Sequence, residues 1–371
     1  MRELDETAGG GPIGARLAAW RRHRELTRDD LAARTGLEPG YLAGLETGGE
    51  WVDRRGRLAV LANALRLDVA DLTGQPYPPR GQEHAVVRAV AFHLRRSLVR
   101  RQPATASGVL LEELAERIHA AARADAVGDE QHLALTLPKL IEAADHALAA
   151  PSGPGRDEAV RLRVDAHVLA AGLLRRLGYR DLAWLLLHRA RPAAREPLPV
   201  LVEEVRLLID LGLPNYALAR ADHTGVGAGW ELPALAAVAQ AMAGCRPEAE
   251  RLLATAAGRA ADARESALVI AARAAVAAEF GDAAEAADHG RAADHAALDG
   301  AHRSGLLVVA AAAEARQGRA DEAAALLVEA DAKAPLRLRL DPFARDLVAA
   351  LADRTTVHTA AVRNLGGRAG L

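Results

Sequence analysis

The feature that most constrains the fold is a regular spacing of glycine and small residues in the C-terminal two-thirds of the chain. Five glycines, Gly178, Gly212, Gly244, Gly281 and Gly318, stand at intervals of 34, 32, 37 and 37 residues. An alanine follows each glycine by five residues, and an alanine or valine precedes each by seven. Glycine accepts the left-handed conformation that ends a helix, and small residues let two helices pack closely. The spacing predicts stacked helical pairs.

The composition also favours helices. Half of the 371 residues are apolar, but only 3 % are aromatic. A core with so few rings must be built from Ala, Leu and Val. Ala and Leu favour helices, whereas strands prefer β-branched and aromatic residues. We therefore predict an all-α fold.

The glycine spacing resembles the tetratricopeptide repeat (TPR), a helical pair of about 34 residues whose copies stack into a superhelix. The resemblance is weakest after Gly212, where Thr224 and a glycine-rich loop shorten the second helix. It implies a TPR-like α-solenoid over residues 82–371. Residues 336–352 are expected to cap the last repeat. Residues 357–371 then either stack as a further half-repeat or fold back into the groove of the last repeats.

In TPR solenoids the first helix of each pair lines the concave face, where partners bind. The expected groove has charged side chains at one end and small apolar residues at the other. Its residues are Asp165, Arg175, Arg206, Glu231, Val238, Ala275 and Val308. Related peptide sensors hold the ligand backbone with Asn, which is rare in this chain. A peptide, a small apolar ligand and a protein partner all remain open as occupants.

A second pattern, from Leu26 to Gly48, predicts two short helices joined by a sharp turn. Thr27 and Asp30 have the spacing of a capping box at the start of the first helix, with the acid favoured by the helix dipole. Gly36 is suited to end that helix in the left-handed conformation. Apolar residues fall where the two helices must face each other. They are Leu31, Ala32, Leu37, Leu42 and Leu45.

This spacing resembles the helix-turn-helix of the Cro/C1-type (XRE) family, including its actinobacterial regulators. In that family the second helix enters the major groove of DNA and the first crosses the backbone. Apolar residues at helical spacing on either side supply three more helices, so the resemblance implies a five-helix DNA-binding domain. A proline-rich segment closes it. The expected domains are a flexible tail at 1–12, the helix-turn-helix domain at 13–75, a linker at 76–81 and the repeat domain at 82–371.

The expected DNA surface makes phosphate contacts and few base contacts. Arg28 at the start of the first helix, and Arg54, Arg55 and Arg57 beyond the pair, are expected to hold phosphates. The outward face of the second helix offers no Arg, Asn or Gln to read bases. That face consists of Glu38, Pro39, Gly40, Ala43, Gly44 and Thr47. Sequence choice is therefore expected to depend partly on DNA shape.

Net charge, cysteine content and hydropathy limit how the protein could bind DNA and which cellular compartment suits it. A formal net charge of −2 excludes binding to nucleic acid through overall basicity, so any DNA contact must be local. Cys245 is the only cysteine, which excludes an internal disulfide and suits a reducing compartment. No apolar run approaches the ~18 residues of a membrane span, and the N-terminus has no apolar signal core. We expect a cytoplasmic protein without membrane contact.

No motif for catalysis, a metal or a cofactor is present. His289, His295 and His302 are spaced by six and seven residues and cannot converge on one metal from a straight helix. We therefore expect no enzymatic activity, no metal and no cofactor. The leading hypothesis is a transcriptional regulator that binds double-stranded DNA as a homodimer and senses a ligand or protein partner through its repeats. The alternative is a TPR-type interaction scaffold with a vestigial helix-turn-helix.

Overall fold

Helices are the only regular secondary structure among the residues that the structure describes. In the computed structural model these residues form twenty-one helices and no strand, which confirms the all-α fold. None of the described helices is both long enough and apolar enough to cross a membrane. The described residues are 11–99, 110–149, 155–191, 197–222 and 229–371.

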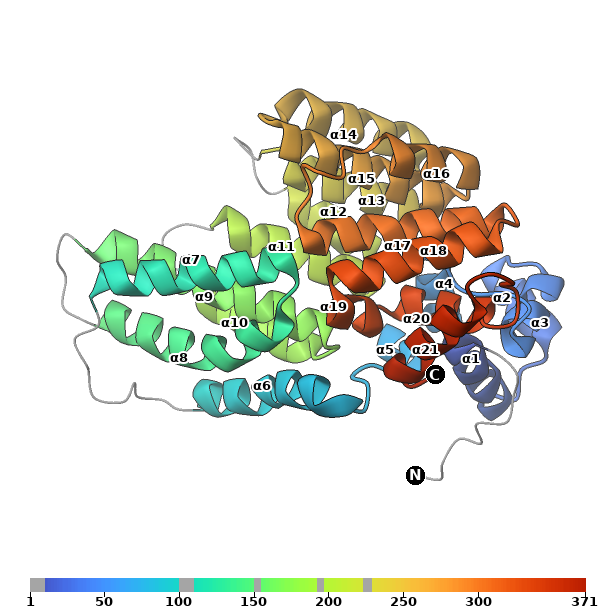
Figure 1. Ribbon diagram of the computed structural model, residues 1–371, viewed down its shortest axis with the longest axis horizontal. Helices are drawn as coiled ribbons and strands as arrows, with labels where there is room; N and C mark the ends of the chain where they lie inside the picture. The colour runs from blue at the N-terminus through green and yellow to red at the C-terminus, as the bar shows by residue number, and fades with distance from the viewer. Residues whose placement is uncertain (1–10, 100–109, 150–154, 192–196, 223–228) are drawn as a thin grey trace.

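Five short helices form an N-terminal unit, residues 11–74, which we call the head (Figure 1). They enclose one apolar core, in which Leu31, Leu42 and Leu45 of the predicted helical pair are completely buried. The five-helix arrangement is therefore confirmed. The helices are α1 (Pro12–His23), α2 (Arg28–Thr35), α3 (Pro39–Thr47), α4 (Arg55–Leu65) and α5 (Val69–Thr73).

The remaining helices form the body, most of which consists of helical pairs joined by short turns. An additional helix, α6, packs on α8 at the start of the body. The helices are α6 (Gly81–Val99), α7 (Leu111–Val127), α8 (Glu130–Ala149), α9 (Arg156–Arg176), α10 (Arg180–Ala190), α11 (Leu198–Asp210), α12 (Pro214–Asp222), α13 (Glu231–Met242), α14 (Arg246–Arg259), α15 (Ala263–Phe280), α16 (Ala283–Ala292), α17 (Gly300–Arg316), α18 (Ala320–Lys333), α19 (Pro335–Leu340), α20 (Pro342–Leu351) and α21 (Thr359–Ala369).

The repeated glycines separate the two helices of five pairs, from α9 and α10 to α17 and α18. Their φ angles are 88°, 72°, 81°, 86° and 81° in chain order, a region where a Cβ atom is strained. The alanines five residues after them and the small residues seven before them are at most 1 % exposed. The predicted stacking of helical pairs is thus confirmed. The more specific TPR assignment stays a prediction.

The C-terminal helices continue the stack. α21 packs on α18 and α20, and its Val362 and Leu365 share a core with Leu327 of α18 and Leu347 of α20. The alternative in which residues 357–371 fold back into the groove is wrong, because the apolar face of α21 covers α18. The short second helix predicted after Gly212 is α12, and the glycine-rich loop at 223–228 lies outside the described residues.

The body curves until its last helices meet its first ones (Figure 1). Gly300 at the start of α17 approaches α7 so closely that a Cβ there would lie 3.0 Å from the carbonyl oxygen of Val127. Arg337 of α19 donates at 2.8 Å to both Asp125 of α7 and Glu130 of α8. These contacts close the concave surface of the superhelix into the walls of a central space.

The segment between head and body is packed against the body. Its prolines stop the helix as predicted, but Tyr77 is buried under the guanidinium of Arg345, 3.9 Å from the ring centroid. Gln75 donates to the carbonyl of Leu340 at 3.0 Å and accepts from Arg180 at 2.7 Å. The expected linker is therefore part of the interface that fixes the head on the body.

Candidate functional site

The helix-turn-helix has the local structure that its residues predict. The Thr27 hydroxyl accepts from the backbone amide of Asp30 at 3.0 Å, and the Asp30 carboxylate accepts from the amide of Thr27 at 2.9 Å. Gly36 ends α2 with φ of 68°. The capping box fixes the start of α2, and the left-handed turn at Gly36 sets the angle between α2 and α3.

The predicted base-facing surface of α3 lies on the outside of the head. Glu38, Pro39, Gly40 and Thr47 are exposed, and Ala43 is half-buried. Of its two polar side chains, Glu38 and Thr47, the Thr47 hydroxyl already donates to the Ala43 carbonyl at 2.9 Å. This face is therefore no better suited to reading bases than the sequence predicted. Contact of this face with DNA stays a prediction.

Arg28 stands at the N-terminus of α2 and is held by a buried carboxylate. Glu46 accepts from Arg28 at 2.8 Å and from Arg21 at 2.6 Å. Burial opposes ionisation of Glu46, but the two arginines outweigh it and hold the pKa of Glu46 below its usual value. The Arg28 side chain remains 46 % exposed. It is positioned and accessible, as a phosphate contact requires.

The arginines after α3 are placed differently from Arg28, because two of them face the body. The Arg55 guanidinium lies 3.9 Å from Asp210 of α11 and 5.1 Å from the ring centroid of Phe343 of α20. Arg54 packs against Gly281, where a Cβ would overlap its guanidinium. These partners are more than 150 residues away in the chain, so the sequence did not reveal them. In this arrangement Arg54 and Arg55 are held at the interface with the body.

Arg57 stays within the head. Its guanidinium lies 4.6 Å from the ring centroid of Tyr41 and 3.8 Å from the carboxylate of Asp53. Asp53 also pairs with Arg316 of the body at 2.6 Å. Arg57 is therefore linked to the interface through Asp53, and binding of a DNA phosphate by Arg57 stays a prediction.

Buried charged residues of the body hold the head in place, and sequence reasoning missed all of them. Asp346 of α20 accepts from the backbone amides of Ile13 at 3.0 Å and Val52 at 2.8 Å. Burial raises the pKa of Asp346 to about 6, and the two amides only partly oppose this. No local pattern signals this role, because an Asp in an amphipathic helix reads as an ordinary polar residue.

Arg316 of α17 forms the second anchor. It binds Glu50, donates to Asp53 at 2.6 Å and to the Trp51 carbonyl at 2.7 Å, and covers the Trp51 ring at 3.9 Å from the centroid. Trp51 thereby joins the apolar core of the last repeats instead of the core of the head. Cation–π contact and three polar contacts on one guanidinium make this anchor specific.

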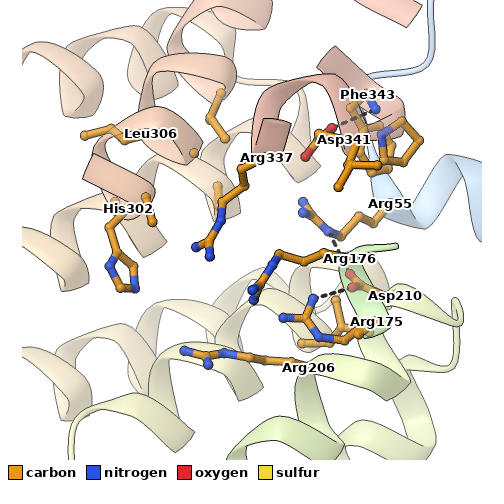
Figure 2. Close-up of a pocket in the computed structure, with 18 of the residues that line it drawn as sticks. Arg55, Arg175, Arg176, Arg206, Asp210, His302, Leu306, Arg337, Asp341 and Phe343 are labelled. Carbon is orange, nitrogen blue, oxygen red and sulfur yellow. Dashed lines mark hydrogen bonds and ion pairs between the residues drawn. The ribbon is translucent and has the colours of Figure 1, made fainter. Parts of the chain in front are cut away.

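A cavity of about 720 Å³ lies where the head meets the concave face of the body (Figure 2). Of the predicted groove residues, Arg175, Arg206, Glu231 and Ala275 line it. In Figure 2 Arg175 and Arg206 reach into the space from one side and Arg337 from the other. The first helices of these pairs therefore face the cavity, and binding of a ligand or partner by these residues stays a prediction.

Three predicted groove residues do not line the cavity. Val238 and Val308 are 9 % and 8 % exposed and lie in apolar clusters between neighbouring helices. Asp165 is half-buried near the middle of α9 and does not line the cavity either. The superhelix is curved more tightly than an open groove, so these faces of α13 and α17 pack against adjacent pairs.

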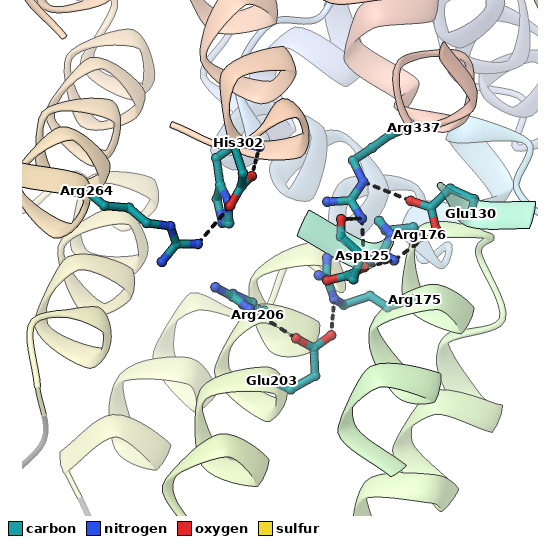
Figure 3. A network of polar contacts seen from close by, with 10 residues as sticks. Asp125, Glu130, Arg175, Arg176, Glu203, Arg206, Arg264, His302 and Arg337 are labelled. Carbon is teal, nitrogen blue, oxygen red and sulfur yellow. Dashed lines mark hydrogen bonds and ion pairs between the residues drawn. The ribbon is translucent and has the colours of Figure 1, made fainter. Parts of the chain in front are cut away.

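One wall of the cavity is a network of ion pairs (Figure 3). Arg175 pairs with Glu203 at 2.7 Å and Asp210 at 2.6 Å, and Arg206 pairs with Glu203 and Glu231. The carboxylates offset the positive charge, so this wall is polar without a large excess of either sign.

The ion pairs continue where the ends of the body meet. Arg176 and Arg337 both bind Asp125 and Glu130. Burial opposes ionisation of Asp125, but the two arginines outweigh it and lower its pKa to about 2. The same cluster thus joins α7, α8, α9 and α19 while it faces the cavity.

The other wall of the cavity is apolar. Leu268, Ala271 and Ala275 of α15 and Leu306 and Val309 of α17 supply it. Within the described residues, no cluster of three or more His, Cys, Asp or Glu side chains has an arrangement that suits a metal ion. The cavity therefore offers charged hydrogen-bonding groups on one side and hydrocarbon on the other.

In the comparison with known proteins, the match covers the head alone. Residues 12–73 match the family model described as a helix-turn-helix domain, with bounds close to the expected 13–75. Searches of curated proteins and of solved structures found no match to the chain. Together with the geometry of α2 and α3, the family match identifies the head as an N-terminal helix-turn-helix DNA-binding domain.

Proposed function

We propose that the protein is a transcriptional regulator of the Cro/C1 (XRE) type whose TPR-like body senses a molecule bound in the cavity. The observation that carries this proposal is the composition of the cavity wall. Arg55, Leu58 and Val69 of the head line it together with residues of the body. A molecule bound there would contact the head directly, so its binding free energy would depend on where the head lies.

The cavity walls favour a small amphipathic molecule. A volume of about 720 Å³ falls within the range of roughly 300–1,000 Å³ typical of small-molecule sites. Arg175 and Arg206 would orient a polar group, and Leu268 and Leu306 would cover an apolar one. A long peptide or a protein would need a groove open along its length, whereas contact between α7 and α17 closes this one.

We further propose that the regulator acts as a homodimer in the cytoplasm. Helix-turn-helix dimers bind two half-sites separated by about one turn of DNA, roughly 34–36 Å. A body that shifts when its cavity fills would change the separation of two heads and hence the affinity for such a site.

Capture of genomic DNA by the full-length protein, followed by sequencing, tests the function. We expect a limited set of sites with a common shape or sequence. Enrichment of no DNA at low salt would favour the alternative, a protein-interaction scaffold with a vestigial helix-turn-helix.

Filling the cavity tests the sensor role. Ala275→Trp places a large ring in the cavity, and Ala254→Trp places the same ring on the exposed side of α14 as the matched control. We expect a low-molecular-mass cell extract to raise the melting temperature of the wild type and of the control, because a ligand that binds only the folded state stabilises it. An equal rise in the Ala275→Trp variant would exclude the cavity as the site.

A further inference from the structure

The first turn of α4 binds a carboxylate that comes from the body. The backbone amide of Arg55 donates to Glu279 Oε1 at 2.6 Å, and the amide of Gly56 donates to Glu279 Oε2 at 3.0 Å. Arg54 precedes the helix and provides no side-chain cap for it. The amides of a first turn have no partner within their own helix, and the helix dipole favours an anion beside them. Glu279 therefore fills an anion site on the head.

The fit between α4 and the body is close. A Cβ at Gly56 would lie 3.0 Å from the carbonyl oxygen of Met242, so a larger residue would push α4 away from α13. Glu279, near the end of α15, is 9 % exposed. Its burial raises its pKa, although Arg55 and the two amides oppose this. Among the described residues these two amides are the donors to its carboxylate.

A DNA phosphate would bind to the same groups. A phosphodiester presents two anionic oxygens, as a carboxylate does, and free amides at a helix N-terminus bind both. Arg54, Arg55 and Arg57 surround this turn and are the residues expected to hold phosphates. Arg54 is packed against Gly281, two residues after Glu279. The body therefore covers the amides and the adjacent cation together.

We propose that Glu279 is an internal mimic of a DNA phosphate, which occupies a phosphate site of the head until the head leaves the body. This inference rests on the DNA-binding function proposed above. In the docked head the outer face of α3 and Arg28 remain accessible to DNA, but the two amides of α4 are not available to bind a phosphate. Docking and DNA binding then compete for the same two amides, and the docked form binds DNA more weakly.

The substitution Glu279→Gln in the full-length protein tests the competition. Gln keeps the shape of Glu but carries no charge and has one acceptor oxygen, so one of the two amides loses its partner. Binding to a short fluorescent DNA duplex of mixed sequence is measured by anisotropy over a series of salt concentrations. We expect tighter binding and a slope of log affinity against log salt that is steeper by about 0.9 for each additional phosphate that the released head binds.

Two further variants separate release of the head from a simple change of charge. Glu314→Gln removes the same charge from a buried residue whose partners are Arg291 and Arg319 of the body, so it should leave the slope unchanged. Arg316→Gln loosens another anchor of the head, its contacts with Glu50, Trp51 and Asp53. It removes a positive charge, which by itself would weaken DNA binding, and tighter binding would therefore come from release of the head.

Hydrogen exchange of residues 53–58 reports docking without DNA, and faster exchange is expected in Glu279→Gln and Arg316→Gln. Unchanged exchange in both variants would overturn the assigned contact. Faster exchange with the affinity and salt slope of the wild type would overturn the competition while DNA binding stands. Failure of the wild type and of both released variants to bind the duplex at low salt would instead overturn the DNA-binding function, and the mimic with it.

Discussion

Gly305 and Gly318 differ in backbone conformation although both have open space where a Cβ would lie. Gly305 is in the interior of α17, whereas Gly318 has φ of 81° in the turn that follows. Gly305→Ala should raise the free energy of unfolding by roughly 1 kcal/mol through helix propensity. Gly318→Ala should lower it by roughly 1–2 kcal/mol, because alanine is strained in the left-handed region. Urea unfolding measures both, and changes of the same sign would contradict the argument.

At the same scale, His167 makes the stability of the body dependent on pH. Burial lowers the pKa of His167 to about 4 and outweighs the attraction by Asp145, whereas the unfolded side chain has a pKa of about 6.5. Between these values the unfolded state binds more protons. The free energy of unfolding should therefore fall as the pH is lowered from about 7 to 4, by at most about 1.4 kcal/mol per pH unit.

The variant His167→Leu isolates this contribution. It should remove that part of the pH dependence, while His93→Gln on the exposed face of α6 should not. The variant must be compared with the wild type because Asp346, whose pKa is raised to about 6, changes the free energy of unfolding with pH in the opposite direction. Protonation of Asp346 favours the folded state, and its contribution is lost as the pH rises through 6. Parallel curves for His167→Leu and the wild type would exclude His167 as the source.

At the scale of the element, the N-terminus of α2 is the part of the head best prepared to bind a phosphate. Glu46 orients Arg28, and the docked body leaves it accessible. Arg28→Ala should weaken binding to all duplex sequences alike and reduce the salt slope by about 0.9. Arg251→Ala, an exposed arginine of α14 that pairs with Glu248, removes the same charge from the body and serves as the control. Loss of discrimination between sequences, without a smaller slope, would show that Arg28 reads bases.

At the scale of the whole molecule, the head is both a unit with its own core and a part of a larger interface. Its core contains residues of all five helices, and Phe343 is the residue that the body adds. The isolated segment 1–80 should therefore unfold cooperatively in a thermal melt followed by circular dichroism. Trp51, which is covered by Arg316 in the whole chain, should become exposed and shift its fluorescence emission to the red. A melt without a cooperative transition would contradict the predicted boundary near residue 75.

The sequence by itself determined the features that depend on neighbours along the chain. The capping box at Thr27, the left-handed turns at Gly36 and Gly178, and the burial of small residues at fixed distances from each repeated glycine all follow from local backbone geometry and side-chain size. The all-α fold, the five-helix head and the stacked pairs were predictable for this reason. Arg175, Arg206, Glu231 and Ala275 of the first helices line the cavity, and binding of a ligand by them stays a prediction.

Only the tertiary structure decided which elements that are distant in the chain contact one another. The amide of Arg55 and Glu279 are 224 residues apart, and the amide of Ile13 and Asp346 are 333 apart. Such contacts depend on the overall curvature of the body, which is the sum of many small rotations between neighbouring helical pairs. No local sequence pattern specifies that sum. The same curvature closes the groove into a cavity, buries Val238 and Val308, and turns Arg54 and Arg55 from the expected DNA surface toward the body.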